Sequence, residues 1–69
     1  MNNTDIKITN SINNTIITIP KKTAANIADK LQAAGINVVE IRYQYAGDMA
    51  SVIVYTAVSN SKIMEVINN

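Results

Sequence analysis

The first twenty residues show the two-residue period of a β-hairpin with one buried face. Apolar residues recur at even positions at the start of the chain, and the segment 15–19 is β-branched throughout, which is typical of a strand. Asn13 and Asn14 between them tolerate the positive φ of a tight turn. With that turn, Ile8 lies opposite Ile19. One face of the hairpin then carries Ile6, Ile8, Ile12, Ile17 and Ile19.

A helical period follows this hairpin. Pro20 ends the second strand, because proline cannot donate to a strand ladder. Apolar residues then recur every three or four positions over 22–34, which predicts a helix that begins at Lys22 or Thr23. Gly35 suits the C-terminal cap, because glycine adopts the left-handed conformation without strain. The side chains expected on the buried stripe are Ala24, Ile27, Ala28, Leu31 and Ala34, with Ile36 packing on the last turn.

A second hairpin is predicted over 38–45 and 50–58, with its turn at Gly47-Asp48. A two-residue turn at this point sets Tyr43 opposite Val52. The face toward the core is then Val39, Ile41, Tyr43, Val52 and Val54. The other, open face carries Val38, Glu40, Arg42, Gln44, Ile53 and Tyr55.

The segment after residue 58 predicts a short second helix, in which Ser59-Asn60-Ser61 offers N-cap side chains. Its buried edge is Ile63, Met64 and Ile67. The order ββαββα over residues 1–69 predicts one α+β domain, a two-layer sandwich of a four-stranded antiparallel sheet with two helices on one face. From Ile16 onward this order is that of a ferredoxin-like domain without its final strand. We expect the N-terminal strand to occupy that vacant position.

The stretch from Ile17 to Val58 also resembles an ACT domain, a small ferredoxin-like regulatory module. The resemblance rests on the run Ala34-Gly35-Ile36-Asn37-Val38 at the end of the helix, followed by a hairpin. It implies a small effector, often an amino acid, bound where the first strand meets the first helix at a dimer interface. ACT-like sequences have Pro-Gly in that loop. Here Lys21 follows Pro20, which departs from the pattern.

Composition argues against an enzyme. The chain has 69 residues, no cysteine and no histidine, and its carboxylates are not paired in the sequence. A nucleophile with its base, a zinc site and a disulfide are therefore not expected, and we predict a non-enzymatic protein without a cofactor or metal. A domain of this size buries only about 60% of the surface of its unfolded chain. Since a disulfide and a zinc site are not expected, a partner chain is the additional source of stability that we expect for this domain.

Charge and hydropathy bear on partners and location. The net charge is +1, and the only basic run is Lys21-Lys22, which argues against nucleic acid. Tyr43 and Tyr45 fall on the predicted inward face, where they could not stack on bases. No apolar run is long enough to cross a membrane, and the first residues lack the features of a signal peptide. We therefore expect a cytoplasmic protein.

Three groups of residues are candidate sites. Four apolar side chains in one patch of the open sheet face indicate an interface, and they are Ile16, Val38, Ile53 and Tyr55. Glu40 and Arg42 on the same face form a candidate polar binding site or a solvated ion pair. A candidate effector or anion loop comprises Lys21, Lys22, Gly35 and Asn37, although a solvated helix start also explains the two lysines.

Three functions are open on this evidence. The first is a protein-interaction or regulatory module that forms a homodimer through its open sheet face or an edge strand, with ACT-like effector binding as one form. The second is a small inhibitor or adaptor, encoded by a mobile element, that binds a larger host protein. The frequent asparagine and isoleucine, typical of AT-rich genomes, fit that origin. The third is a weak nucleic-acid binder.

Overall fold

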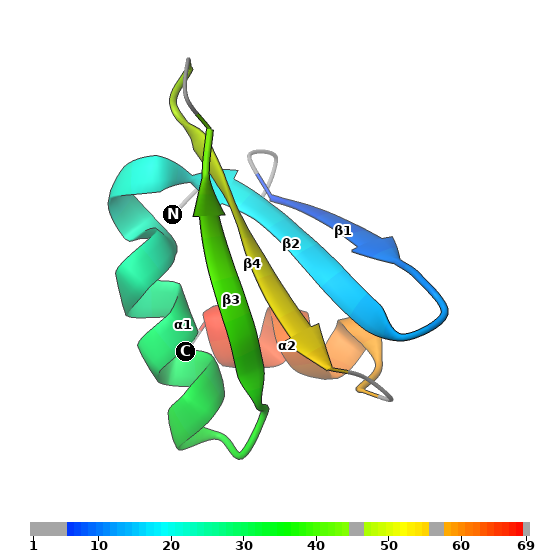
Figure 1. The fold of residues 1–69 in the computed structure, drawn as a ribbon. Helices are drawn as coiled ribbons and strands as arrows, with labels where there is room; N and C mark the ends of the chain where they lie inside the picture. The colour runs from blue at the N-terminus through cyan, green and yellow to red at the C-terminus, as the bar shows by residue number, and fades with distance from the viewer. Residues whose placement is uncertain (1–5, 45–46, 56–57, 69) are drawn as a thin grey trace.

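The computed structural model of the chain describes residues 6–44, 47–55 and 58–68. Four strands form one antiparallel sheet, and two α-helices lie together on one of its faces (Figure 1). The strands are β1 (Lys7–Asn10), β2 (Asn14–Pro20), β3 (Val38–Tyr43) and β4 (Met49–Tyr55). The helices are α1 (Ala24–Ala33), preceded by the 3-10 turn η2 (Lys21–Thr23), and α2 (Asn60–Ile67). The predicted two-layer α+β sandwich is confirmed.

The order of strands across the sheet is β1-β2-β4-β3. β1 lies beside β2 and antiparallel to it, in the place that the last strand of a ferredoxin-like sheet would occupy. The predicted replacement of that strand by the N-terminal one is therefore the observed arrangement. β2 and β4 are internal, and β1 and β3 are the two edge strands.

The core lies between the sheet and the helices. One row of paired residues crosses all four strands on the helix side, and it consists of Ile8, Ile17, Val52 and Ile41. Its two central members, Ile17 and Val52, are fully buried because both belong to internal strands. α1 covers this row with Ala24, Ile27, Ala28 and Leu31, and α2 adds Ile63, Val66 and Ile67.

The register of the first hairpin differs from the prediction by two residues. Ile8 lies opposite Ile17, not Ile19, and the Ser11 amide donates to the Asn14 carbonyl at 2.8 Å. The turn therefore centres one residue earlier, and this moves every partner by two. Ile12, expected in the core, is in the turn and 98% exposed. The expected positive φ at Asn13 and Asn14 is also wrong, because among the described residues only glycines have one.

The second hairpin shows the same kind of shift. Tyr43 lies opposite Ala50 and Ile41 opposite Val52, so this turn also centres one residue earlier than Gly47-Asp48. The strands end earlier than predicted, at Tyr43 and Tyr55. Positions 45, 56 and 57, which the prediction placed in strands, lie outside the described residues.

A bulge between Val38 and Glu40 changes which side chains at the start of β3 point toward the core. An extra residue in one strand reverses the facing of every residue before it relative to those after it. Val38 therefore packs against the core, although it was predicted on the open face. Val39, predicted to be buried, is 47% exposed.

The capping of α1 follows the sequence. The α-helix begins at Ala24, one residue after the later of the two predicted starts, because Lys22 and Thr23 belong to the 3-10 turn and Thr23 is the N-cap residue. Gly35 has φ +85°, and the amide of Ile36 donates to the Leu31 carbonyl at 2.9 Å, as in a Schellman motif. Ile36 is buried on the last turn, as predicted. Ala34 was predicted on the buried stripe, but it is the C-cap residue and is exposed.

The capping of α2 depends on one side chain. The Ser59 hydroxyl accepts a hydrogen bond from the Lys62 amide at 3.2 Å, as the prediction of an N-cap in this segment requires. Met64, predicted on the buried edge, is half-buried against the core. Val66 was not predicted and is buried, because it follows Ile63 by three residues on the same face.

Substitution of Gly35 tests the cap of α1. No atom lies within 4 Å of a Cβ placed there, so a side chain meets no clash and only the positive φ opposes it. Gly35→Ala should lower the free energy of unfolding by about 1 kcal/mol in urea titrations. Gly35→Asn should lower it less, because asparagine tolerates this conformation. Equal stability of Gly35→Ala and the parent chain would contradict the proposed cap.

Two isoleucines of the first hairpin test its register. Ile17→Val removes one methylene from the core and should cost about 0.5–1.5 kcal/mol of unfolding free energy. The same change at the exposed Ile12 should alter it by less than about 0.5 kcal/mol. Both variants can be compared by urea unfolding followed by circular dichroism. A loss from Ile12→Val as large as that from Ile17→Val would restore the register predicted from the sequence, which placed both residues on the core face.

Candidate interaction surface

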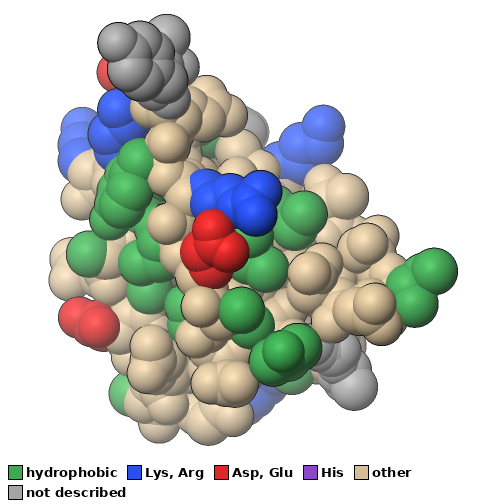
Figure 2. Space-filling model, viewed as in Figure 1, with side chains coloured by type: hydrophobic (Ala, Val, Ile, Leu, Met, Phe, Trp, Pro, Cys, Tyr) green, Lys and Arg blue, Asp and Glu red, His purple; other side chains and the backbone are tan. Residues whose placement is uncertain are grey.

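The face of the sheet opposite the helices is not covered by any described element (Figure 1). The pair of Glu40 and Arg42 lies on this face, with Arg42 Nε 2.7 Å from Glu40 Oε2. Figure 2 shows an acidic and a basic side chain in contact near the middle of the face, with hydrophobic side chains around them. The strand period places the two residues on one side, and the structure brings them into contact. Both side chains are largely solvated, at 45% and 70% exposure.

The predicted apolar interface is only partly accessible. Ile16 lies directly opposite Ile53, so these two do meet on the open face. Ile53 is only 8% exposed, because it is on an internal strand between Ile16 and Glu40. Val38 faces the core. Tyr55 is the one member of the predicted set that is largely exposed, at 58%.

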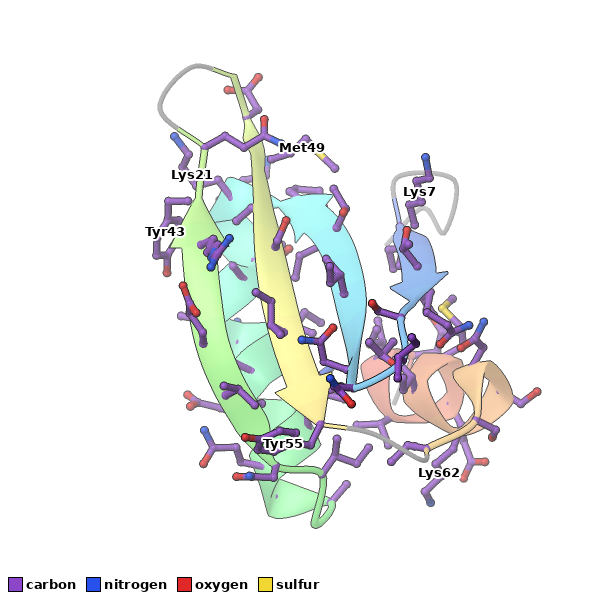
Figure 3. The ribbon with its side chains drawn as sticks, turned by 45° about the vertical axis from the view of Figure 1, so that its right-hand side comes forward. Lys7, Lys21, Tyr43, Met49, Tyr55 and Lys62 are labelled. Carbon is purple, nitrogen blue, oxygen red and sulfur yellow. The ribbon has the colours of Figure 1, made fainter. Side chains whose placement is uncertain are left out.

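The exposed apolar surface gathers instead on the β3 side of the sheet. The described residues include four large apolar side chains that are exposed, and three of them are Val39, Tyr43 and Tyr55. Figure 3 shows Tyr43 at the outer edge of β3 and Tyr55 at the opposite end of the sheet, beside the start of β3. Together with Glu40 and Arg42 these three form what we call the β3 surface. This surface extends around the edge of the sheet, because Glu40, Arg42 and Tyr55 are on the open face and Tyr43 is on the helix side, opposite Ala50. The fourth exposed side chain, Ile12, is in the turn between β1 and β2.

Sequence reasoning missed Val39 and Tyr43 as surface residues. Val39 was placed inward because the alternation of β3 was continued through the bulge. Tyr43 does lie on the helix side, as predicted, since it pairs with the buried Ala50, but it is 53% exposed because it is the last residue of an edge strand. Glycine and proline often mark such irregularities, but β3 contains neither. The sequence therefore carried no local signal that could have located the bulge.

The outer edge of β3 presents free backbone groups. In an antiparallel ladder, residues alternate between those whose N–H and C=O face the partner strand and those whose groups point away. The Gln44 amide donates to the Met49 carbonyl at 3.4 Å, so the backbone N–H and C=O of Gln44 point toward β4. The backbone groups of Arg42, two residues earlier, point the same way. Ile41 and Tyr43 therefore direct their N–H and C=O toward the outer edge, where no described strand lies.

The four residues of the predicted effector loop do not form one site. Lys21 and Lys22 precede α1, whereas Gly35 and Asn37 follow it. A ten-residue helix separates the two pairs by about 15 Å. Two separate hollows result, one lined by Pro20, Lys21, Lys22, Asp48 and Met49, and one lined by Gln32, Gly35, Ile36 and Asn37.

Residues 6–44, 47–55 and 58–68 contain neither a metal-binding cluster nor a membrane-spanning helix. No three acidic side chains there come close enough together to hold a metal ion, and the chain has no histidine or cysteine. No helix in the same residues is both long enough and apolar enough to cross a membrane. The β3 surface is therefore the feature on which a functional proposal can be built.

Comparisons of the chain with protein-family models, with curated proteins and with solved structures found no match. The resemblance to ACT domains thus stays a prediction from the sequence.

Neutralising the ion pair tests its contribution to the isolated chain. Glu40→Gln and Arg42→Gln should each change the free energy of unfolding by less than about 1 kcal/mol, because solvent screens exposed pairs. Urea unfolding at low protein concentration is the suitable measurement, since association then contributes least. A loss above about 2 kcal/mol would show that the pair stabilises the monomer and is not free for a partner.

Proposed function

We propose that this chain is a non-enzymatic protein-interaction module that works as a homodimer, in which a second copy covers the β3 surface. The observation that carries the proposal is the position of the exposed apolar side chains. Val39 and Tyr43 belong to the edge strand β3 and Tyr55 lies beside its start, whereas isolated exposed apolar residues would be scattered. Tyrosine is also enriched at protein interfaces, where its ring is covered and its hydroxyl can stay hydrated.

The size of the domain supports a partner. A 69-residue chain has a small core, and this one has no disulfide. Within the described residues the two helices cover one face of the sheet, and a second copy can supply additional apolar burial. Such burial would stabilise the folded state more as the concentration of the chain rises, with a logarithmic dependence.

The charges of the β3 surface fit a copy of itself better than a strongly charged partner. Glu40 and Arg42 have opposite signs and are two residues apart on one strand. A two-fold axis between two such strands can bring each glutamate to the arginine of the other copy. The net charge of +1 also means that two copies repel each other little.

A larger protein could be the partner instead, as the adaptor hypothesis states, and it would use the same β3 surface. The two functions differ in one measurable property. A homodimer shows a mass that rises with its own concentration, whereas an adaptor alone stays monomeric.

Sedimentation of the pure chain tests the homodimer. We expect the parent chain to shift from monomer to dimer as its concentration rises. Tyr43→Asp should weaken the association by at least about tenfold, because it removes an aromatic contact and places a charge in the interface.

Ile12→Asp is the matched control. It introduces the same charge at an exposed apolar residue in the turn between β1 and β2, which β4 separates from the edge strand β3, and should sediment like the parent chain. Urea unfolding of the monomers should show that both variants remain folded. A parent chain that stays monomeric at every concentration would contradict the proposed function, and so would equal weakening by both variants.

A further inference from the structure

We infer that the second copy joins through the outer edge of β3, as an antiparallel neighbour in a register centred on Ile41. The two sheets then form one continuous sheet, with all helices on the same side. This inference rests on the proposed homodimer and specifies how its two chains meet. Backbone direction, charge and the length of the edge all favour this arrangement.

Backbone direction limits the possible registers. Ile41 and Tyr43 direct their N–H and C=O groups to the outer edge, and only such residues can exchange hydrogen bonds with another strand. Three symmetric registers pair such residues, but the one that pairs Tyr43 with Tyr43 is centred on the last residue of β3 and overlaps the two strands by that residue only, so two remain. In one, Ile41 pairs with Ile41 of the second copy. In the other, Ile41 pairs with Tyr43 and the centre falls on Arg42.

Charge selects between these two registers. The centre at Arg42 puts the two arginines directly opposite each other, and like charges in that position are destabilising. The centre at Ile41 puts Glu40 opposite Arg42 of the second copy, twice. These residues are a non-hydrogen-bonded pair, in which side chains on one face come closest. The exposed ion pair within one chain can thus become a four-residue network across both.

The same register places apolar side chains together. Tyr43 of one copy comes level with Val39 of the other, and these are the two exposed apolar residues of β3 itself. The bulge before Glu40 ends the regular part of the β3 edge, so the two copies share few backbone hydrogen bonds. The contacts between Tyr43 and Val39 then have to supply part of the stability of the dimer. A short pairing also limits uncontrolled growth through the edge.

The other edge of the sheet is less suited to this role. β1 has four residues against six in β3, and none of its side chains is a large exposed apolar one. Short edge strands are a usual means of preventing association. The two edges therefore differ in both length and side chains, and β3 is the edge that can accept a strand.

Pairwise cysteine cross-linking tests the register. The chain contains no cysteine, so single substitutions report without background. We expect an equimolar mixture of Glu40→Cys and Arg42→Cys chains to form the mixed disulfide on air oxidation, because these positions face each other with Cα atoms about 4.5 Å apart. In the mixed pair the second Glu40–Arg42 contact is retained. Ile12→Cys, exposed and remote from β3, measures cross-linking by random collision.

The outcomes separate the register from the proposed function. A mixed disulfide well above the level given by Ile12→Cys, with little product from either variant alone, supports the register centred on Ile41. Preferential linkage of Arg42→Cys to itself overturns that register. A parent chain that sediments as a dimer without any excess cross-link overturns pairing through β3 but leaves the homodimer standing. A chain that never dimerises contradicts both.

Charge reversal gives an independent test that needs no cross-link. Glu40→Arg places arginines at both positions of one chain, and Arg42→Glu places glutamates at both positions of another. Each variant alone should associate at least tenfold more weakly than the parent chain. Mixing them should restore association, because every contact across the interface then joins opposite charges while every contact within a chain is repulsive. Failure of the mixture to associate overturns the proposed facing of Glu40 and Arg42.

Discussion

The pairing of β2 with β4 is the constraint on which the rest of this structure depends. Seven consecutive residue pairs join the strands, from Asn14 and Tyr55 to Pro20 and Met49. Because both strands are internal, each inward side chain has neighbours on two sides. Ile17 and Val52 consequently lose all contact with solvent, and the helices pack where that apolar row runs. The edge strands β1 and β3 pair with the outer sides of β2 and β4 and complete the sheet.

The uneven covering of this sheet explains why the β3 surface lies at its edge and not at the middle of its open face. Helices occupy one face, and the middle of the other face is closed by its own side chains, since Ile53 lies between Ile16 and Glu40. No such closure exists at β3, where a strand neighbour is missing on one side and Tyr43 extends past the edge (Figure 3). Exposed apolar area and free backbone groups therefore coincide at β3. In a chain with so few reactive side chains, this coincidence shifts attention from chemistry to association.

Much of the fold could be predicted because it depends on local chemistry. Pro20 had to end a strand, Gly35 could take the positive φ that ends α1, and the change of period between them predicted a helix. The strand order followed from connection rules, since a hairpin places its two strands side by side. The candidate surface was only half predictable. Glu40 and Arg42 share a face through the period of a strand, whereas Val38 and Val39 exchange roles at a bulge that no glycine or proline announces.

The sequence by itself determined the elements, their order and the absence of histidine and cysteine chemistry, because these depend on local propensity, period and composition. The tertiary structure decided the two hairpin registers and therefore which side chains are exposed. Asn13-Asn14 and Gly47-Asp48 favour turns, but in the assembled sheet both turns centre one residue earlier, and Ile8, Ile17, Val52 and Ile41 pair in one row across the four strands. That row places Ile12 in solvent and Tyr43 at the edge of β3. Register is a property of strands in contact, and no strand carries it alone.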